Sequence, residues 1–385
     1  MKILHVCLTG GYTEGFAYQE NYLSKYHALD GHDVTILTTE YCWNHNKWRK
    51  CKEIDYWNKN NVHIIRLPYK VKLPYKINSY VGKFQGLDKL LNNIKPNLIF
   101  IHNLQFRDIK LINSYKKAHK NTRILADSHT DFSNSARNWL SKYILYKFYW
   151  KKYATIANHC VEKFYGVLPA RVDFLRNIYK LPANKCELLV MGADDEEVKN
   201  ASKKERLEET RRKFGYTTDD FVIVTGGKID IWKKQTLLLM QAIKKINNDK
   251  LKLLIFGPVS DNIKNEFNSL VDAKQIIHID WANSTQSYEY FAIANLVVFP
   301  GRHSVYWEQA AGQGKPLICK YWEGTTHIDL GGNVIFLMED SVEEMVYQIK
   351  KVINDKEKYK LMKKIAIEKG MQTFSYKKIS AKSIE

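Results

Sequence analysis

The chain lacks the features that mark membrane-spanning, secreted or low-complexity proteins. No uncharged stretch approaches the roughly 18 apolar residues that a membrane-spanning helix needs, and the N-terminal stretch MKILHVCLTGG becomes polar too soon for a signal peptide. Only 8 Pro and 19 Gly occur in 385 residues, which excludes collagen-like and linker-like chains. We therefore expect a globular protein of the cytoplasm.

Cysteine is also scarce, and its spacing does not suggest metal binding. The 6 cysteines are scattered along the chain without a Cys-x2-Cys pair, and no clustered histidines complete a zinc site. The sequence therefore predicts free, mostly buried thiols.

Acidic residues are outnumbered, with 41 Asp and Glu against 60 Lys and Arg, for a formal net charge of +19. Such an excess favours an anionic partner, which could be nucleic acid, a phospholipid surface or a phosphate-bearing substrate. Lysine dominates in a chain that is also rich in Asn, Ile and Tyr, so part of the excess can reflect composition. Charge alone does not choose among these partners.

Short apolar runs alternate with longer amphipathic stretches, which is typical of parallel sheets joined by crossover helices. Two such series are visible, and their expected strands are ILHVCL, HDVTILTT, NLIFIH, RILADSH and TIAN in the first, and FVIVTGG, KLLIFG, IIHID, LVVFPG and PLICK in the second. This pattern predicts an α/β protein with two Rossmann-like sheets. We place the domains at 1–190 and 191–374, with a C-terminal helix at 375–385 that returns toward the first domain. Ligands of such folds bind at the carboxyl ends of the strands.

In the first domain, three glycines and two histidines follow strands. Gly10, Gly11 and Gly15 come after the first strand, where a helix is expected near Phe16, but their spacing is not the Gly-x-Gly-x-x-Gly of dinucleotide sites. A glycine turn there is equally common as packing. His102 and His129 end later strands, and each could contact a polar substrate. A single histidine is more often structural.

In the second domain, Gly226, Gly227 and Lys228 end a strand, and Lys233 with Lys234 begin the next helix. Separated cations beside open backbone amides suit a diphosphate. The alternative is a solvated lysine pair at a helix start, where positive charge is mildly unfavourable.

Glu308 stands where the loop 301–306 turns into a helix. A carboxylate in a first helical turn gains a few tenths to about 1 kcal/mol from the helix dipole, so it could be a cap. It is equally suited to accept hydrogen bonds from a vicinal diol such as that of a ribose. The residue type alone leaves both interpretations open.

Four segments together resemble one family. They are GHDVTILTT, MGADDEEV, VTGGK continuing to Lys234, and EQAAGQGKPLI, and they occur in order over nearly the whole chain. In this arrangement the chain resembles the retaining nucleotide-sugar glycosyltransferases of the GT-B fold, in particular glycosyltransferase family 4 (group 1), a type found in polysaccharide, capsule and O-antigen biosynthesis. The resemblance implies two Rossmann-like domains that face each other across a cleft, an acceptor domain and a donor domain.

The resemblance also implies roles for individual residues. Glu308 would accept hydrogen bonds from the donor ribose, and Lys228 and Lys234 with Gly227 would bind the diphosphate. His129 would be the catalytic residue that faces the donor sugar. The acceptor and phosphate side would be formed by Gly10, Gly11, Gly15 and His102.

The chain departs from the family at several positions. Pro300 stands where the first glutamate of Glu-x7-Glu is usual, in a shortened loop, and we expect His303, Ser304 and Val305 to make donor contacts there. Lys228 replaces the usual arginine and Met191 an asparagine. No Asp-x-Asp sequence occurs, which weighs against the metal-dependent GT-A glycosyltransferases, so neither a metal nor a cofactor is expected.

We therefore expect a retaining, metal-independent transferase that moves a sugar from a UDP- or GDP-sugar to a hydroxyl of a lipid-linked or polysaccharide acceptor. A sugar-nucleotide 2-epimerase of the same architecture is one alternative, and a basic nucleic-acid-binding protein is another. Because the basic residues are spread over both domains, we expect no nucleic acid partner. Basic aromatic stretches at 69–83 and 138–153 make peripheral docking on an anionic membrane a further expectation. The lysines of 138–153 do not gather on one helical face, so a buried helix whose lysines reach the surface is an equal alternative there.

Overall fold

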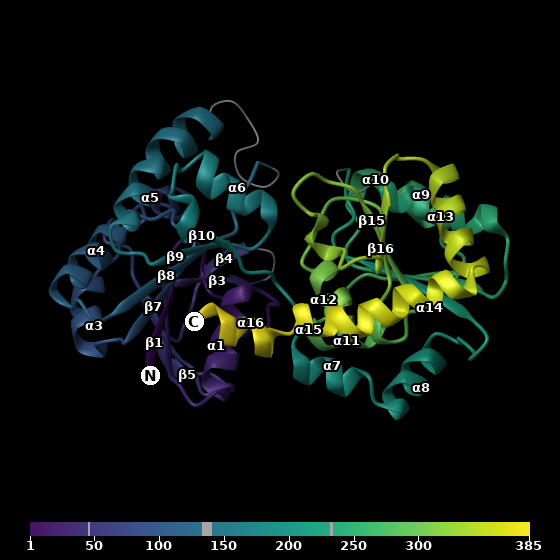
Figure 1. Ribbon diagram of the computed structural model, residues 1–385, viewed down its shortest axis with the longest axis horizontal. Helices are drawn as coiled ribbons and strands as arrows, with labels where there is room; N and C mark the ends of the chain where they lie inside the picture. The colour runs from purple at the N-terminus through teal and green to yellow at the C-terminus, as the bar shows by residue number, and fades with distance from the viewer. Residues whose placement is uncertain (45–46, 133–140, 232–233) are drawn as a thin grey trace. The chain divides into compact units, whose positions relative to one another are not determined.

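Two compact units, each built around a parallel sheet, make up the chain in a computed structural model (Figure 1). The structure describes residues 1–44, 47–132, 141–231 and 234–385. Unit 1 comprises Met1–Val190 and Ser380–Glu385, and unit 2 comprises Met191–Ile379. The predicted α/β class with two Rossmann-like sheets is confirmed.

The sheet of unit 1 has eight strands in the order β10-β9-β8-β7-β1-β2-β6-β5. Neighbouring strands are parallel except β5 and β6, which are antiparallel. The strands are β1 (Lys2–Cys7), β2 (Asp33–Thr39), β5 (Asp55–Trp57), β6 (His63–Leu67), β7 (Leu98–His102), β8 (Arg123–Ser128), β9 (Lys163–Gly166) and β10 (Cys186–Leu188). The central strands β1, β7 and β8 are buried almost throughout, as expected for a parallel sheet with both faces covered.

The helices of unit 1 connect these strands and cover the sheet. They are α1 (Gln19–Leu29), α2 (Tyr75–Val81), α3 (Leu87–Ile94), α4 (Ile109–Ala118), the π-helix η1 (Ser141–Trp150), α5 (Lys151–Asn158) and α6 (Pro169–Asn177). A separate antiparallel pair, β3 (Tyr41–Asn44) and β4 (Lys47–Lys50), follows β2. The apolar side chains of α3, α4, α5 and α6 join those of the sheet in one hydrophobic cluster.

Two details of unit 1 differ from the sequence prediction. The run TIAN, expected as a strand, forms the end of α5, because Ala154 and Ala157 are buried at helical spacing. The next strand of the sheet is instead β9. The first helix begins at Gln19, three residues after Phe16, so the glycine loop after β1 is longer than expected.

Unit 2 contains a six-stranded, entirely parallel sheet in the order β13-β12-β11-β14-β15-β16. The strands are β11 (Phe221–Gly226), β12 (Leu251–Phe256), β13 (Ile276–Ile279), β14 (Leu296–Phe299), β15 (Leu317–Lys320) and β16 (Val334–Leu337). The helices are α7 (Asp195–Ala201), α8 (Lys204–Lys213), α9 (Gln235–Ile246), α10 (Asp261–Leu270), α11 (Ser284–Ala292), α12 (Tyr306–Gly312), α13 (Val342–Asn354), α14 (Lys356–Ile365), α15 (Met371–Thr373) and the start of α16 (Tyr376–Ser383). Strands β11 and β14 are parallel neighbours at the centre of this sheet, so the loops that follow them begin side by side.

Close backbone packing explains Gly192 at the beginning of unit 2. Ala193 donates its N–H to the carbonyl oxygen of Phe374 over 2.7 Å, and Tyr376 donates to the carbonyl oxygen of Ala193 over 3.0 Å. A Cβ at Gly192 would collide with the Phe374 carbonyl oxygen. Glycine is therefore required for this pairing of chain segments that are distant in sequence.

The last residues of the chain are tied into unit 1. Ser380 and Ser383 are fully buried, and both lie 3.1 Å from Nε2 of His27 on α1. Arg123 on β8 donates to the carbonyl oxygens of Ile384, over 2.7 Å, and Glu385, over 2.9 Å. The C-terminal residues thus complete the packing of a domain formed mainly by the first half of the chain.

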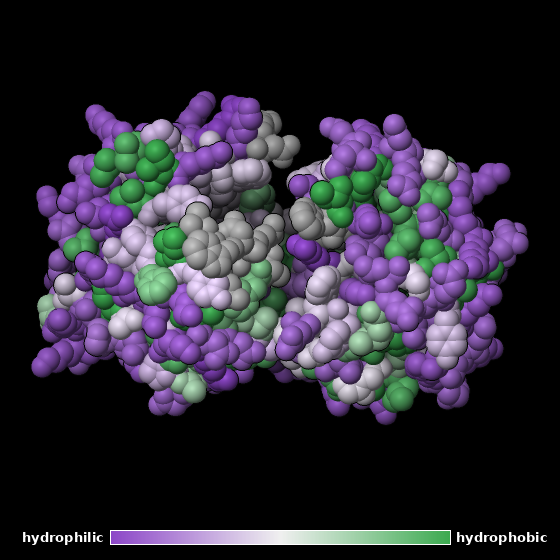
Figure 2. Space-filling model, turned by 90° about the horizontal axis from the view of Figure 1, so that it is seen from above, coloured by the Kyte–Doolittle hydropathy of each residue, from purple (hydrophilic) through white to green (hydrophobic). Residues whose placement is uncertain are grey.

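The face shown in Figure 2 is mainly hydrophilic, with hydrophobic side chains scattered over each unit. Among the residues that the structure describes, no helix has the length and apolar character needed to cross a membrane.

Candidate functional site

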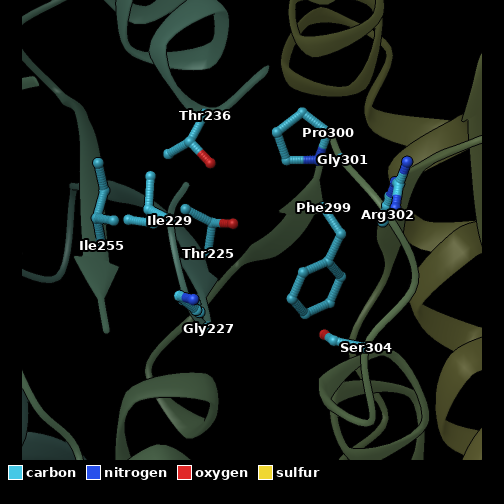
Figure 3. A pocket seen from close by; sticks show the side chains of 12 residues that line it. Thr225, Gly227, Ile229, Thr236, Ile255, Phe299, Pro300, Gly301, Arg302 and Ser304 are labelled. Carbon is cyan, nitrogen blue, oxygen red and sulfur yellow. The ribbon is translucent and has the colours of Figure 1, made fainter. Parts of the chain in front are cut away.

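A pocket in unit 2 lies at the carboxyl ends of β11 and β14 (Figure 3). Its lining combines backbone, two cationic side chains and hydroxyl groups from four segments of the chain. The lining residues are Thr225, Gly226, Gly227, Lys228, Ile229, Thr236, Ile255, Phe299, Pro300, Gly301, Arg302 and Ser304. The position agrees with the rule that ligands bind at the carboxyl ends of parallel strands.

Glycines allow the backbone segments beside this pocket to approach closely. Gly227 has a φ of 113°, which L side chains rarely adopt, and its N–H donates to the carbonyl oxygen of Phe256 over 2.9 Å. A Cβ at Gly226 would collide with the Phe256 ring, and one at Gly257 with the backbone of Gly227. These glycines therefore leave the end of β11 without side chains that would fill the pocket.

The two lysines of this loop remain accessible. The Lys228 side chain is 69% exposed, and its Nζ lies 3.5 Å from an Asp230 carboxylate oxygen. Lys234 is exposed and immediately precedes α9, whose first turn also carries the pocket residue Thr236. Lys233, expected to act with them, lies outside the described residues. An exposed ion pair contributes little, so Lys228 can leave Asp230 and bind a more highly charged anion instead.

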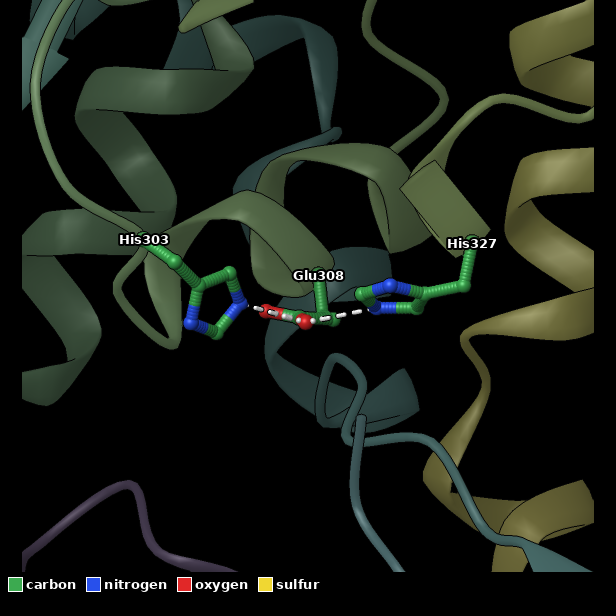
Figure 4. Close-up of side chains that lie close together, drawn as sticks. All are labelled: His303, Glu308 and His327. Carbon is green, nitrogen blue, oxygen red and sulfur yellow. Dashed lines mark hydrogen bonds and ion pairs between the residues drawn. The ribbon is translucent and has the colours of Figure 1, made fainter. Parts of the chain in front are cut away.

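Glu308 lies in the first turn of α12 and is fully buried between two histidines (Figure 4). His303 donates from Nε2 to Glu308 Oε1 over 2.7 Å, and His327 donates from Nε2 to the same oxygen over 2.9 Å. Burial alone would raise the pKa of Glu308, but the two imidazoles hold it well below its usual value. The residue is therefore a carboxylate held in one orientation.

The two oxygens of the Glu308 carboxylate differ in their hydrogen bonding. Among the described residues, Glu308 Oε2 is buried without a hydrogen-bond partner, and the same holds for the Ser304 hydroxyl that lines the pocket. A buried acceptor without a donor costs about 1 to 3 kcal/mol. A ligand hydroxyl could supply the missing bond to either group, and of the two residues Ser304 lines the pocket.

His303, Glu308 and His327 also offer three ligand atoms within 4.8 Å of one another. However, both ring nitrogens lie 2.7 and 2.9 Å from one oxygen, which are hydrogen-bond distances. Nitrogen and oxygen ligands of a tetrahedral zinc ion, with bonds of about 2.0 to 2.1 Å, are separated by roughly 3.3 Å. A metal ion would require both nitrogens to lose their protons and move apart, so this arrangement fits a hydrogen-bonded group better than a metal centre.

In unit 1 a buried carboxylate again lies between two histidines, at the carboxyl ends of β7 and β8. Asp127 Oδ2 accepts from His102 Nδ1 over 2.7 Å, and Asp127 Oδ1 lies 3.5 Å from His129 Nε2. The backbone N–H of His129 donates to Asn103 Oδ1 over 2.8 Å. Burial would raise the pKa of Asp127, whereas His102 and His129 lower it, and the lowering prevails.

The glycines after β1 have different roles. Of the residues that the structure describes, none lies within 4 Å of a Cβ built at Gly10 or Gly15, and Gly15 has a φ of 77°. At Gly11 it would collide with the Tyr41 carbonyl oxygen and the Trp48 ring. Gly11 is thus explained by packing against the β3–β4 pair, and only Gly10 and Gly15 leave open space.

The structure brings the predicted residues together in two groups. Gly227, Lys228 and Ser304 line the unit 2 pocket, whereas Val305 directly precedes α12 and the partly buried His303 contacts Glu308. His102 and His129 share Asp127 in unit 1.

Sequence reasoning missed several residues of these groups: Thr225, Thr236, Arg302, His327, His5 and His27. Arg302 and His327 follow strands, as the recognised residues do, so their position was an available signal. His5 lies within a strand and His27 within a helix, and nothing in the sequence marks either.

Comparisons with known proteins agree with this architecture. Residues 206–369 match the model of the family of glycosyl transferases group 1. The chain is similar to a glycosyltransferase from Rickettsia africae ESF-5, with a TM-score of 0.70 and 16% identity over 100% of this chain and 96% of that one. It is also similar to Anabaena Alr3699/HepE in complex with UDP (TM-score 0.69, 13% identity, 99% and 98% covered).

A third similar structure is WaaG, a glycosyltransferase involved in lipopolysaccharide biosynthesis (TM-score 0.63, 13% identity, 96% and 97% covered). Comparison with curated protein sequences gives no match. The fold is GT-B, as predicted, and the match over 206–369 supports the resemblance to group 1 glycosyltransferases.

The double hydrogen bond to Glu308 predicts how two substitutions differ. Glu308→Ala leaves both imidazole N–H groups without an acceptor and should lower the free energy of unfolding by about 2 to 5 kcal/mol. Glu308→Gln keeps an oxygen for both donors but loses the charge, so it should lose less than the alanine variant, about 1 to 2 kcal/mol near pH 7. Denaturant titration measures both values, and equal losses in the two variants would contradict the shared acceptor.

The difference in the free energy of unfolding between the wild type and Glu308→Gln should depend on pH. Because the folded state lowers the pKa of Glu308, its contribution to stability is present above the ordinary value of 4.5 and is lost as pH falls below it. The glutamine variant should lose less stability than the wild type over that range.

Proposed function

We propose that this protein is a retaining glycosyltransferase that moves a sugar from a nucleoside-diphosphate sugar to an acceptor hydroxyl. The donor would be a UDP- or GDP-sugar, and the acceptor a lipid-linked or polysaccharide intermediate. In this proposal unit 2 binds the nucleotide. The observation that carries it is an oxygen of Glu308 that has no partner within the described part of the chain; this buried carboxylate is close in sequence to the pocket residue Ser304.

A ribose supplies what this oxygen lacks. Glu308 Oε1 is saturated by His303 and His327, so Oε2 faces no competing donor among the described residues. A ribose hydroxyl donating to it would form a charge-assisted hydrogen bond, which is worth about 1.5 to 3 kcal/mol. His303 then acts on the ligand through Glu308, because its imidazole already bonds to the carboxylate.

The cations of the pocket suit the diphosphate. Lys228 and Arg302 line it together with the glycine backbone, and Lys234 stands before α9. Cations and backbone amides placed in advance can stabilise the negative charge of a departing nucleoside diphosphate without a metal ion. The role of His129 toward the donor sugar, in a same-face attack assisted by the donor phosphate, stays a prediction from the family resemblance.

A sugar-nucleotide 2-epimerase remains the enzymatic alternative. An epimerase changes its nucleotide sugar without a second substrate, whereas a transferase releases the nucleoside diphosphate in quantity only when an acceptor is present. Following nucleotide release with and without acceptor therefore separates the two.

The isosteric variant Glu308→Gln tests the ribose contact. Its amide oxygen stays bonded to both histidines, so an NH2 group replaces the free acceptor Oε2. We expect the affinity for UDP, measured by calorimetry, to fall about tenfold or more, since a charge-assisted bond is lost. Glu208→Gln, an exposed glutamate on α8, is the matched control. Unchanged affinity in a folded Glu308→Gln protein would reject the ribose assignment.

The diphosphate assignment predicts that removing both lysine charges weakens the binding of UDP. Lys228→Ala with Lys234→Ala should weaken UDP binding at least tenfold while changing uridine binding little, because only UDP carries the diphosphate. The control Lys244→Ala with Lys250→Ala removes the same charge from exposed positions of unit 2 at the end of α9 and before β12. Wild-type affinity in the first double variant would reject the assignment.

We also propose that unit 1 docks on an anionic membrane surface, where a lipid-linked acceptor would be available. Residues 69–83 include α2 and expose Ile77 and Tyr80, at 50% and 58%, beside exposed lysines such as Lys72 and Lys76. The second candidate stretch, 138–153, is described only from residue 141. There η1 exposes Phe148, whereas Trp150 and Tyr153 are buried, so only part of its aromatic surface can reach a lipid.

Vesicle binding tests the membrane proposal. Lys72→Gln with Lys76→Gln should weaken the affinity for phosphatidylglycerol vesicles, measured by co-sedimentation, about thirtyfold, since each lysine near an anionic surface contributes about 1 kcal/mol. Lys350→Gln with Lys351→Gln on α13 is the control. Binding that ignores the anionic lipid content, or equal effects of both pairs, would refute docking through α2.

A further inference from the structure

Three buried histidines of unit 1 lie in line between the C-terminal segment and Asp127. His27 Nε2 lies 3.1 Å from the Ser380 carbonyl oxygen, and His27 Nδ1 lies 3.0 Å from His5 Nε2. His5 Nδ1 lies 2.9 Å from His102 Nε2, and His102 Nδ1 lies 2.7 Å from Asp127 Oδ2. The rings of His5 and His102 are nearly parallel, at 11°, as in-plane hydrogen bonds between imidazoles allow.

The two ends of this chain fix its number of protons. A carbonyl oxygen and a carboxylate can only accept, so His27 must present Nε2–H and His102 must present Nδ1–H. The two contacts between rings each need one further proton. Four hydrogen bonds thus require four protons, whereas three neutral imidazoles carry only three.

The Ser383 hydroxyl does not remove this requirement. It lies 3.1 Å from His27 Nε2, but it donates to the Ser380 carbonyl oxygen over 2.7 Å. Its oxygen can therefore only accept from the ring.

We propose that His5, His27 and His102 form a proton-bearing chain with one proton more than three neutral rings, held as a His102 imidazolium paired with the Asp127 carboxylate. Asp127 is then a positioning residue for His129, the candidate catalytic side chain. The chain itself is independent of the proposed function, and only its bearing on His129 rests on it.

The electrostatics place the extra proton on His102. Burial lowers the pKa of His27 to about 4 and lowers that of His5 as well, so both rings stay neutral near pH 7. Burial would also lower the pKa of His102, but the adjoining Asp127 carboxylate raises it instead. The other titratable groups that act on these residues are Glu20 on α1, His32 after it and Cys7 on β1.

The Asp127–His102 pair is also connected to His129 through Asn103. Asp127 also accepts the backbone N–H of Asn103 over 3.2 Å, and Asn103 in turn accepts the N–H of His129. Because His102 balances its charge, Asp127 can remain ionised beside His129 without a counterion from solvent. The docked C-terminal residues fix the direction of the hydrogen bond from His27 Nε2, and Asp127 fixes that of the bond from His102 Nδ1.

Asp127→Asn provides the sharpest test. The asparagine NH2 can donate to His102 Nδ1, after which three ring protons satisfy all four hydrogen bonds and every ring is neutral. Nitrogen-15 NMR of the histidine rings should therefore show both nitrogens of His102 protonated in the wild type, between about pH 5 and 8, and only Nε2 protonated in the variant. His5 and His27 should carry their single proton on Nε2 in both proteins.

A singly protonated His102 in the wild type would overturn the proposal, and so would a doubly protonated His102 that persists in Asp127→Asn. His5→Gln, whose amide can still accept from His102 and donate to His27, should keep the His102 signature, whereas His5→Phe should lose it. Asp55→Asn, which alters the exposed His63–Asp55 pair, should leave all three chain rings unchanged. Retention of the wild-type signature in His5→Phe would likewise refute the chain.

The proposed function and the histidine chain are tested by different measurements, so either can fail without the other. UDP binding is assigned to unit 2, so Asp127→Asn should bind UDP with wild-type affinity. Loss of UDP binding in Glu308→Gln would say nothing about the histidine rings, and altered ring protonation would say nothing about the nucleotide.

Discussion

The need to satisfy a buried carboxylate governs both candidate groups of this protein. Asp127 and Glu308 are each almost fully removed from water, which alone would neutralise them. Each is kept ionised by two histidines, His102 with His129 and His303 with His327. The carboxylates therefore stay charged without an exposed cation, and each orders the loops that supply its histidines.

Parallel pairing makes this arrangement available. In unit 1, β7 and β8 are hydrogen-bonded in a register that sets His102 directly opposite Asp127. In unit 2, β14 and β15 are neighbours, so the loops after them carry His303 and His327 to the two sides of Glu308. Because all these strands point the same way, their polar residues gather at one edge of each sheet.

The two carboxylates differ in what remains unsatisfied, and this difference separates their roles. Both Asp127 oxygens have protein neighbours, and through His102, His5 and His27 the carboxylate is connected to the C-terminal residues. Among the described residues, Glu308 has no donor for one oxygen, and it lies four residues after Ser304, which lines a pocket together with Lys228 and Arg302. The first arrangement suits a rigid support for a neighbouring residue, whereas the second suits ligand binding.

The sequence by itself determined the α/β class, the two series of parallel strands and the loops that carry function, because buried parallel strands appear as apolar runs and glycines mark the turns after them. It singled out Glu308, Lys228 and His129 by their places after strands. It did not determine that TIAN is helical, that Gly11 serves packing, or that His303 bonds to Glu308. Only the tertiary structure decided these points and the alignment of His5, His27 and His102. Such contacts join residues far apart in the chain, and no local spacing encodes them.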